Sequence, residues 1–149
     1  MDFIFKQSTN LEFFKLLPTD WHNSIVPFWD DYADSSRIYL LYHKNKLIAG
    51  GITFKTCSPD MLYDEYEAKK WFDQGFIYLG FIWVIEEYRN KKIGSMWLKE
   101  LINKFPTQKF WLTVDEENLI SFYKKNGFEL IKTLKNEDDI EWLLTYEPE

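Results

Sequence analysis

The segment FIYLGFIWVIEEYRNKKIGSMWLKEL, residues 76–101, constrains the fold more than any other part of this chain. It begins with a nearly continuous apolar run, which is typical of a strand buried on both faces. From Ser95, apolar residues recur on one helical face until Pro106, so a helix follows the strand. The turn between the two elements carries Arg89, Lys91, Lys92 and Gly94. Such a turn presents free backbone N–H groups at the positive end of a helix, where anions and especially phosphates bind.

Common nucleotide-binding patterns do not account for this turn, because neither G-x-x-x-x-G-K-[ST] nor G-x-G-x-x-G occurs in the chain. The basic turn also differs in charge from the chain as a whole. Only 18 basic residues stand against 24 acidic ones, and the formal net charge is -6. An acidic balance disfavours nucleic-acid binding, which needs a basic face. Neutral or cationic substrates suit the composition, while an anion would bind locally at the turn.

The other elements predict an α+β or mixed α/β protein with one strand–helix–strand unit in its middle. We expect further strands at 3–7, 109–114, 128–134 and 140–147, and a hairpin over 37–56 around the polar turn HKNK. We expect helices at 10–17, 19–34, 95–105 and 117–127, the second capped by Thr19 or Asp20 and the last ended by Gly127. Residues 58–75 suggest a loop with a short helix, and Gly50 and Gly51 mark a bulge or a close backbone approach. The length suits a single domain, 1–149.

Residue counts disfavour several kinds of site. Cys57 is the one cysteine of the chain, and His22 and His43 form no cluster at metal-ligand spacing, so we expect no disulfide and no metal. The N-terminal residues lack the pattern of a leader, and no run reaches about eighteen uncharged apolar residues. We expect a cytoplasmic protein with no nucleic-acid or membrane partner, and we leave a homodimer open.

The turn resembles the pyrophosphate loop of the GNAT superfamily of N-acetyltransferases, whose motif is [RQ]-x-x-G-x-[GA]. Arg89 and Gly94 match its first and last positions, and Lys92 stands where the family has its first glycine. A lysine there has a steric cost if the backbone needs a positive φ. The stretch ISFYKKNGFELIKT, residues 120–133, resembles a second hallmark of the family, a short helix with Phe-Tyr followed by Gly-Phe at the start of a strand. The resemblance covers nearly the whole chain.

The resemblance implies the GNAT fold, a central and mostly antiparallel sheet of about six to seven strands with two splayed parallel strands and about four flanking helices. It also implies acetyl-CoA as acyl donor, with pantetheine paired to a strand edge and pyrophosphate wrapped by the N–H groups of the turn. The implied cofactor contacts are Ile82, Trp83, Val84, Arg89, Asn90, Lys91, Lys92, Ile93, Gly94, Ser95 and Asn118. Asn118 also suits the N-cap of its helix, and both roles stay open.

The family resemblance implies a proton donor and an oxyanion site. Tyr123 matches the helix tyrosine that commonly protonates the departing thiolate, although a core aromatic that pairs with Leu119 is the alternative. A backbone N–H near Trp83 or Val84 would hold the tetrahedral oxyanion, so no side chain is needed there.

The base that deprotonates the amine is harder to assign. Tyr78 stands where some relatives carry a glutamate, and a phenol with an unperturbed pKa of about 10 is a poor base at neutral pH. Deprotonation would then pass through an ordered water or through a carboxylate such as Asp115 or Glu86. Both of these also suit ordinary solvated or helix-capping charges.

The acceptor should be recognised by the segments that flank the cleft: residues 29–36, residues 58–75 and the C-terminal hairpin. Their carboxylates and rings include Asp30, Asp31, Asp64, Glu65, Tyr66 and Trp71. Carboxylates beside aromatic faces suit a cationic amine, although each residue taken singly also suits an ordinary surface. A polyamine, an aminoglycoside-like compound, an amino acid and a protein amine all stay open.

The predicted function is therefore an acetyl-CoA-dependent N-acetyltransferase that moves an acetyl group to a primary amine, preferably a small cationic one, by direct attack in a ternary complex. The alternative is a non-catalytic module of the same fold that binds a CoA-like ligand or a protein partner. Lys92 and the absent strand glutamate keep this alternative open.

Overall fold

The computed structural model describes residues 2–9 and 11–149 and is built on a seven-stranded sheet in the order β1-β2-β3-β4-β5-β7-β6. The strands are β1 Phe3–Ser8, β2 Ser36–His43, β3 Lys46–Phe54, β4 Phe76–Val84, β5 Lys109–Val114, β6 Glu129–Asn136 and β7 Asp139–Tyr146. Neighbouring strands are antiparallel except β4 and β5, which are parallel. This arrangement confirms the prediction of a mixed, mostly antiparallel sheet with one parallel pair.

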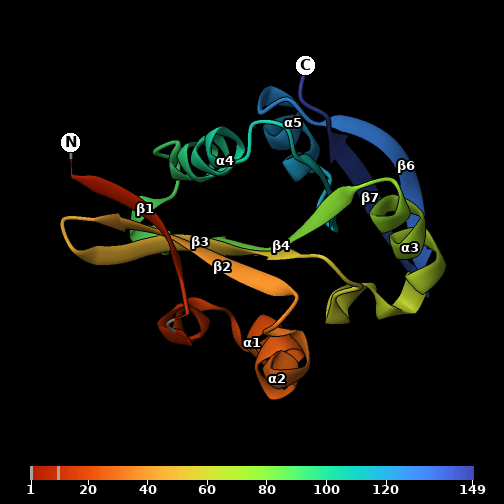
Figure 1. Ribbon diagram of the computed structural model, residues 1–149, viewed down its shortest axis with the longest axis horizontal. Coiled ribbons are helices and arrows are strands. Elements are labelled where there is room, and N and C mark those ends of the chain that lie inside the picture. The colour runs from red at the N-terminus through yellow and green to blue at the C-terminus, as the bar shows by residue number, and fades with distance from the viewer. Residues whose placement is uncertain (1, 10) are drawn as a thin grey trace.

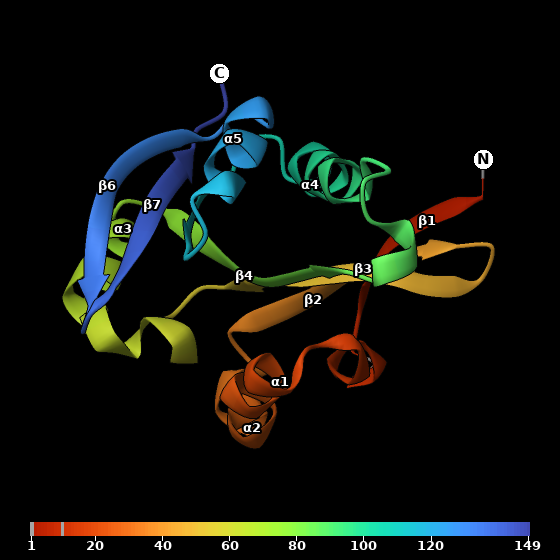
Figure 2. The same cartoon turned by 180° about the vertical axis from the view of Figure 1, so that it is seen from behind.

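Helices cover both faces of the sheet (Figures 1 and 2). The α-helices are α1 Thr19–Ile25, α2 Trp29–Tyr32, α3 Glu65–Asp73, α4 Ile93–Lys104 and α5 Asn118–Lys125, and the 3-10 helices are η1 Leu11–Leu16, η2 Val26–Phe28, η3 Pro59–Asp64 and η4 Glu86–Tyr88. α4 and α5 lie on one face, α1 and α2 lie on the other, and α3 lies beside β6 and β7.

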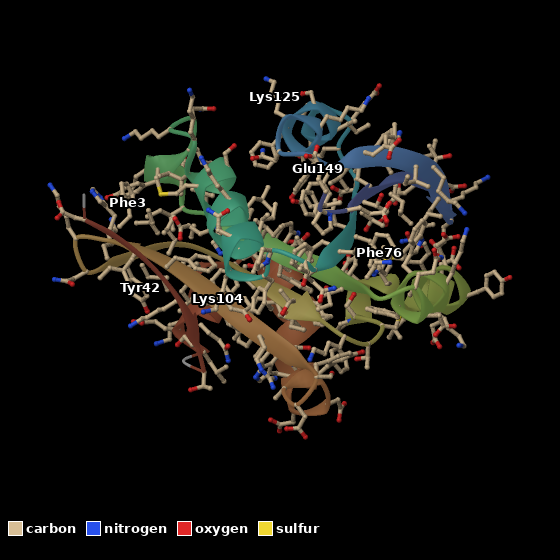
Figure 3. All side chains as sticks on the ribbon, turned by 45° about the horizontal axis from the view of Figure 1, so that its top comes forward. Phe3, Tyr42, Phe76, Lys104, Lys125 and Glu149 are labelled. Atoms are coloured by element: carbon tan, nitrogen blue, oxygen red, sulfur yellow. The ribbon has the colours of Figure 1, made fainter. Side chains whose placement is uncertain are left out.

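Each face of the sheet has its own hydrophobic core. The α1 core, on the side of α1 and α3, includes Phe13, Ile25, Phe54, Tyr78, Trp71 and Trp111. The α4 core, on the side of α4 and α5, includes Tyr39, Leu79, Trp97, Phe110 and Tyr123. In Figure 3, side chains fill the space between the sheet and these two helices, whose last residues Lys104 and Lys125 are labelled. Because side chains alternate along a strand, neighbouring residues of β4 belong to opposite cores.

The helix predicted over 19–34 is divided in the structure. α1 ends at Ile25, η2 contains Pro27, and α2 begins at Trp29. Pro27 has no backbone N–H to donate, so the α-helical hydrogen-bond ladder cannot continue through it. The described residues therefore form five α-helices, where about four were expected. The predicted cap at Thr19 or Asp20 is wrong, because α1 begins directly after Pro18 and has no side-chain cap hydrogen bond.

The helix predicted over 10–17 forms as the 3-10 helix η1, and its expected first residue, Asn10, lies outside the described residues. The predicted strands are confirmed to within two residues at each end. The expected loop of 58–75 contains η3 and α3, so most of it is helical. The short helix expected within this segment is confirmed as α3, although the apolar residues repeat at no clear period that would mark its bounds.

Gly50 and Gly51 combine both roles expected of them. The pairing of β3 with β4 shifts register between Gly50 and Ile52, which is a β-bulge. A Cβ on Gly51 would lie 2.6 Å from the ring of Trp97, and a Cβ on Gly50 would lie 2.6 Å from the ring of Phe13. The two large rings therefore approach the backbone of β3 at neighbouring positions, where a side chain would exclude them.

Gly51→Ala should destabilise the protein by about 1–3 kcal/mol, since overpacking a closely packed core costs that much. The Trp97 ring cannot move away freely, because its Nε1 donates to the carbonyl of Tyr39 at 3.0 Å. Urea unfolding measures the change. Ser121→Ala, on the exposed side of α5, is the matched control and should change stability by less than about 0.5 kcal/mol. Equal stability of the Gly51 variant and wild type would contradict the close packing described here.

Candidate active site

The parallel pair β4 and β5 separates partway along its length. The register joins Phe76 to Lys109, Ile77 to Phe110 and Tyr78 to Trp111. Pairing ends there within the described residues, although β4 continues to Val84 and β5 to Val114. The rest of β4 therefore has no strand partner on the side of β5. This confirms the two splayed strands expected for the fold, and an open strand edge of this kind can pair with an extended ligand.

β4 also contains a bulge beside this opening. Gly50 pairs with Trp83 and Ile52 pairs with Gly80, so two residues of β4 stand opposite one of β3. Phe81, in the bulge, has a φ of 55°, a left-handed conformation that costs a non-glycine residue about 1–2 kcal/mol. The rings of Trp21 at 5.9 Å and Phe54 at 6.1 Å hold it in place. Strain of this kind gathers at functional sites. The sequence did not predict the left-handed conformation of Phe81, because an aromatic residue rarely adopts it.

The basic turn after β4 has a run of free backbone donors. The N–H of Arg89 donates to the carbonyl of Glu86 at 3.1 Å, and the next N–H that donates to a backbone carbonyl of the described residues is that of Met96, to Lys92 at 3.0 Å. The N–H groups of residues 90–95 lie between these two bonds. Asn90 and Lys92 have φ values of 62° and 63°. Such alternation of left-handed and ordinary residues forms an anion-binding concavity.

Lys92 adopts the conformation that the family glycine would adopt at no cost. It is the N-cap of α4, with φ 63° and ψ 23°, and makes no side-chain cap hydrogen bond. Position 92 thus has the left-handed backbone that a glycine adopts easily, although the residue here is a lysine. Gly94 has a different role, because its φ is not positive and a Cβ there would lie 3.0 Å from the ring of Phe122.

Contacts on two sides hold the turn. Toward α5, the side-chain amide of Asn126 donates to the hydroxyl of Ser95 at 3.2 Å. Toward the β2–β3 hairpin, the hydroxyl of Tyr88 and Nδ1 of His43 are 2.7 Å apart, and Lys46 forms an ion pair with Glu87 at 2.6 Å. The donors of the turn are therefore fixed before any ligand arrives.

The basic side chains of the turn are exposed. Arg89 folds back on β4, where its Nε donates to the carbonyl of Val84 at 3.0 Å and its guanidinium lies 4.4 Å from the centre of the Trp83 ring. Lys91 lies 5.6 Å from the ring of Tyr88. Neither lysine of the turn is in a salt bridge with a described residue. The turn therefore has positive charge that no carboxylate of this chain neutralises, which suits a polyanionic ligand.

Tyr123 is positioned by the end of α5. Gly127 has a φ of 91°, its N–H donates to Lys124 at 3.2 Å, and the N–H of Phe128 donates to the carbonyl of Tyr123 at 3.0 Å. This is a Schellman motif, and the accompanying contact joins the rings of Tyr123 and Phe128 at 5.5 Å. Tyr123 is 7% exposed, and burial raises its pKa. Its phenol therefore stays protonated, as a proton donor must.

Asn118 and Asp115 are both exposed in the segment between β5 and α5. Asn118 is the first residue of α5, Glu117 occupies the N-cap, and no side-chain cap hydrogen bond forms, so the N-cap role predicted for Asn118 is wrong. Its predicted contact with pantetheine stays a prediction. Asp115 directly follows β5. Among the described residues, no hydrogen bond joins Asp115 to Tyr78 or Tyr123.

Tyr78 makes a contact with Asp60 that no sequence pattern predicted. It is 2% exposed, and its hydroxyl donates to Oδ2 of Asp60 in η3 at 2.6 Å. Burial, followed by the charge of Asp60, raises the pKa of Tyr78 well above its usual value. Asp60 is reached by solvent, yet desolvation also raises its pKa. Tyr78 is thus a hydrogen-bond donor to a carboxylate, and the carboxylate is the better base of the two.

Tyr78 and Tyr123 belong to opposite faces of the sheet. Tyr78 is part of the α1 core, and Tyr123 is part of the α4 core. The gap between β4 and β5 interrupts the sheet between these two cores. A group that lies in this gap could be reached from one face by a base and from the other by an acid.

Within residues 2–9 and 11–149, no group of three or more His, Cys, Asp or Glu side chains is arranged to hold a metal ion. No helix in the same part of the chain has the length and apolar character needed to span a membrane.

The sequence matches the family model described as the Acetyltransferase (GNAT) family over residues 5–128. The chain therefore belongs to the GNAT acetyltransferase family. Enzymes of this family use acetyl-CoA as their acetyl donor. Comparison with curated protein sequences finds no significant match.

Solved structures with the same fold include several acetyltransferases. One is a GNAT family acetyltransferase from Elizabethkingia anophelis with acetyl-CoA bound, 17% identical, with a TM-score of 0.65 and 98% of each chain covered. Another is Arabidopsis thaliana Naa50 in complex with the bisubstrate analogue CoA-Ac-MVNAL, 18% identical, with a TM-score of 0.66 and 99% of each chain covered. A putative acetyltransferase of the family from Desulfovibrio desulfuricans has a TM-score of 0.71 at 12% identity, over 97% of this chain and 98% of that one. At these identities the similarity establishes the fold.

Lys92→Gly should stabilise the free protein by up to about 1 kcal/mol, because glycine removes the left-handed strain but gains freedom in the unfolded chain. Lys91→Gly is the matched control. Lys91 does not have a positive φ, so its replacement should destabilise by about 0.5–1 kcal/mol. Chemical denaturation of both variants gives the two values. Equal destabilisation by the two glycines would contradict strain at Lys92.

Asp60→Asn should make the protein more stable than wild type at neutral pH. The raised pKa means that the folded state holds the Asp60 proton more tightly than the unfolded chain does. Wild-type stability therefore falls as pH rises from the unfolded pKa of about 3.9 to the higher folded value, and it stays lower above that. Asparagine remains neutral and can still accept from Tyr78, so the difference should vanish in acid.

Urea unfolding at neutral and acidic pH measures this difference. Asp73→Asn is the control, because Asp73 is exposed and its ion pair with Lys69 should contribute less than about 1 kcal/mol. If the Asp60 variant is less stable than wild type at neutral pH, the desolvation cost assigned to the ionised carboxylate is contradicted.

Proposed function

We propose that this protein is an acetyl-CoA-dependent N-acetyltransferase that acetylates a small cationic primary amine in a ternary complex. The observation that carries the proposal is the end of β4–β5 pairing at Tyr78 and Trp111, followed on the same strand by a turn with free donors over residues 90–95. A thioester with a pantetheine arm and a pyrophosphate needs both features. The arm pairs with an open strand edge, and the phosphates accept from backbone N–H groups.

In this proposal, the open edge of β4 pairs with the pantetheine amides, and the turn binds the pyrophosphate. The edge residues are Ile82, Trp83 and Val84, and the turn residues are Arg89, Asn90, Lys91, Lys92, Ile93, Gly94 and Ser95. The exposed lysines supply charge to phosphate oxygens that the N–H groups do not reach. Asn118, exposed at the start of α5, contacts the pantetheine arm.

Acetyl transfer then needs a hydrogen-bond donor to the tetrahedral oxyanion and a proton donor to the departing sulfur. A backbone N–H near Trp83 or Val84, next to the bulge at Phe81, stabilises the oxyanion. The phenol of Tyr123 gives its proton to the sulfur as the C–S bond breaks. A phenol is protonated at neutral pH, and the burial that raises the pKa of Tyr123 does not change this state. Asp115 stays a candidate base, whereas the raised pKa of Tyr78 suits a donor rather than a base.

A cationic acceptor agrees with the charge of the chain. The formal net charge is -6, and the exposed Asp30 and Asp31 of α2 lie on the side of the sheet opposite to α4 and α5. An acidic surface raises the local concentration of cationic amines. The basic turn serves the anionic cofactor separately.

We further propose that residues 1–149 act as one catalytic domain in the cytoplasm, with acetyl-CoA and the amine as partners and without nucleic acid or membrane. A homodimer stays open. Light scattering at several protein concentrations, with and without CoA, measures the oligomeric state.

Tyr123→Phe should lower the rate of CoA thiol release by about 100-fold, since a positioned general acid contributes about 100- to 10,000-fold. The assay uses acetyl-CoA with a panel of spermidine, an aminoglycoside, lysine and a short peptide. Thermal stabilisation by CoA should be unchanged, because the ring still packs on Phe128. Tyr42→Phe on β2 is the matched control and should keep full activity.

Two other outcomes separate the alternatives. Stabilisation by CoA without transfer to any amine would favour the non-catalytic module. Neither stabilisation nor transfer would contradict the assignment of the turn as a pyrophosphate site.

A further inference from the structure

The side chain of Arg89 turns back from the anion-binding concavity onto β4. Its Nε donates to the carbonyl of Val84 at 3.0 Å, and its Cζ lies 4.4 Å from the centre of the Trp83 ring. Arg89 is nevertheless exposed. Ordering a long, exposed side chain at two points costs rotamer entropy, so the contact of Arg89 with the end of β4 needs a physical reason.

The short helix η4 brings Arg89 back to the strand. The N–H of Tyr88 donates to the carbonyl of Ile85 at 3.0 Å, and the N–H of Arg89 donates to the carbonyl of Glu86 at 3.1 Å. The chain therefore makes one tight turn directly after β4. This turn returns Arg89 to Val84, which lies five residues earlier. The backbone of Arg89 is thus placed by local hydrogen bonds.

The carbonyl of Val84 lies on the open edge of β4. Val84 pairs with Ala49 of β3, and the N–H of the next residue, Ile85, donates to the carbonyl of Ile48 at 2.9 Å. The N–H of Ile85 therefore points toward β3. The C=O and N–H of one trans peptide unit point in opposite directions, so the Val84 carbonyl points away from β3 and toward the gap between β4 and β5.

The same alternation locates other groups of the open edge. Antiparallel pairs alternate between those that exchange hydrogen bonds and those that do not. The pair of Trp83 with Gly50 is next to the Val84 pair, so the N–H of Trp83 points toward β3 and the carbonyl of Ile82 points toward the gap. On the described edge from Ile82 to Val84, both of these carbonyls and the N–H of Val84 thus face the gap.

Arg89 fills one of these two acceptors. Its Nε occupies the carbonyl of Val84, and this leaves the carbonyl of Ile82 and the N–H of Val84 for an extended ligand. Acceptors repeat every two residues along a strand edge, so a ligand with more than one amide could pair in shifted registers. The filled acceptor disfavours the shifted register. It therefore fixes where pairing ends and where the ligand turns toward residues 90–95.

The ring of Trp83 connects Arg89 to the bulge of β4. It lies 5.3 Å from the ring of Trp21 in α1, and the Trp21 ring lies 5.9 Å from that of Phe81, which has the left-handed backbone. A guanidinium is attracted to the face of an indole ring. One series of contacts thus joins the two ends of the open edge, with Phe81 at its start and Arg89 beyond its last residue.

Resting on the proposed function, we propose that Arg89 is a positioning residue that sets the register of the pantetheine arm on β4. Its side chain acts through the carbonyl of Val84 and the ring of Trp83. The N–H groups of residues 90–95 and the lysines of the turn bind the phosphates. The property of Arg89 that matters is therefore the planar N–H donor at Nε, whereas its positive charge is secondary.

Two substitutions separate the donor from the charge. Arg89→Gln is neutral, but its Nε2 follows Cδ as Nε does in arginine, so it keeps a planar donor at the same place in the side chain. Arg89→Lys keeps the charge but has a methylene group at that place. Calorimetry measures how wild type and each variant bind CoA and pantetheine, which has the amides of CoA without its phosphates.

Pantetheine should bind to Arg89→Gln within about twofold of wild type and to Arg89→Lys about fivefold more weakly, since one hydrogen bond contributes about that factor. CoA should also bind about fivefold more weakly to Arg89→Lys. Arg37→Lys is the matched control, because Arg37 is also exposed and donates to the carbonyl of Ser36 at 2.7 Å, at the start of β2. It should bind both ligands as wild type does.

The opposite order would overturn the role of Arg89. If Arg89→Lys binds CoA like wild type, Arg89→Gln binds CoA more weakly and neither change affects pantetheine, Arg89 acts by its charge on the phosphates. If wild type binds CoA but not pantetheine, pairing along β4 contributes too little for a register to matter, and the inference also fails. Wild type that binds neither ligand would instead contradict the proposed function.

Discussion

Pairing between β4 and β5 stops at Tyr78 and Trp111, and the arrangement of the candidate site depends on that early end. An interior strand with free backbone groups is costly unless something pairs with them. The structure maintains this edge through the strained bulge at Phe81, which Trp21 and Phe54 hold from the α1 core. The same gap interrupts the sheet between the two hydrophobic cores, and the proposed function places the reacting groups there.

Charge is distributed according to this geometry. Arg89, Lys91 and Lys92 of the turn are exposed and form no ion pair with a described residue, and the dipole of α4 adds to their positive charge. Asp30 and Asp31, which are exposed on α2, lie on the face of the sheet opposite to α4. The proposed function places an anionic donor and a cationic acceptor at separate parts of one acidic protein, which is possible because screening limits each charge interaction to about 10 Å.

Much of the fold and the position of the basic turn followed from local patterns. The buried run before the turn, the helix after it and the Phe-Tyr and Gly-Phe pairs are contiguous, and their roles depend on neighbours within a few residues. Gly127 is an example, since the Schellman motif that positions Tyr123 involves only residues 123–128. The divided helix at Pro27 was also readable in principle, because a proline inside a helical pattern interrupts the ladder.

Short-range periodicity and backbone chemistry were enough to predict the strand, the turn and the helix from the sequence, and the motifs in and after them indicated the family that the match over residues 5–128 shows. Only the tertiary structure decided that Lys92 adopts the left-handed conformation, that Phe81 forms a bulge, and that Asp60 reaches Tyr78. Asp60 and Tyr78 are 18 residues apart. Their contact follows from the packing of η3 against β4, which no periodicity in the chain encodes.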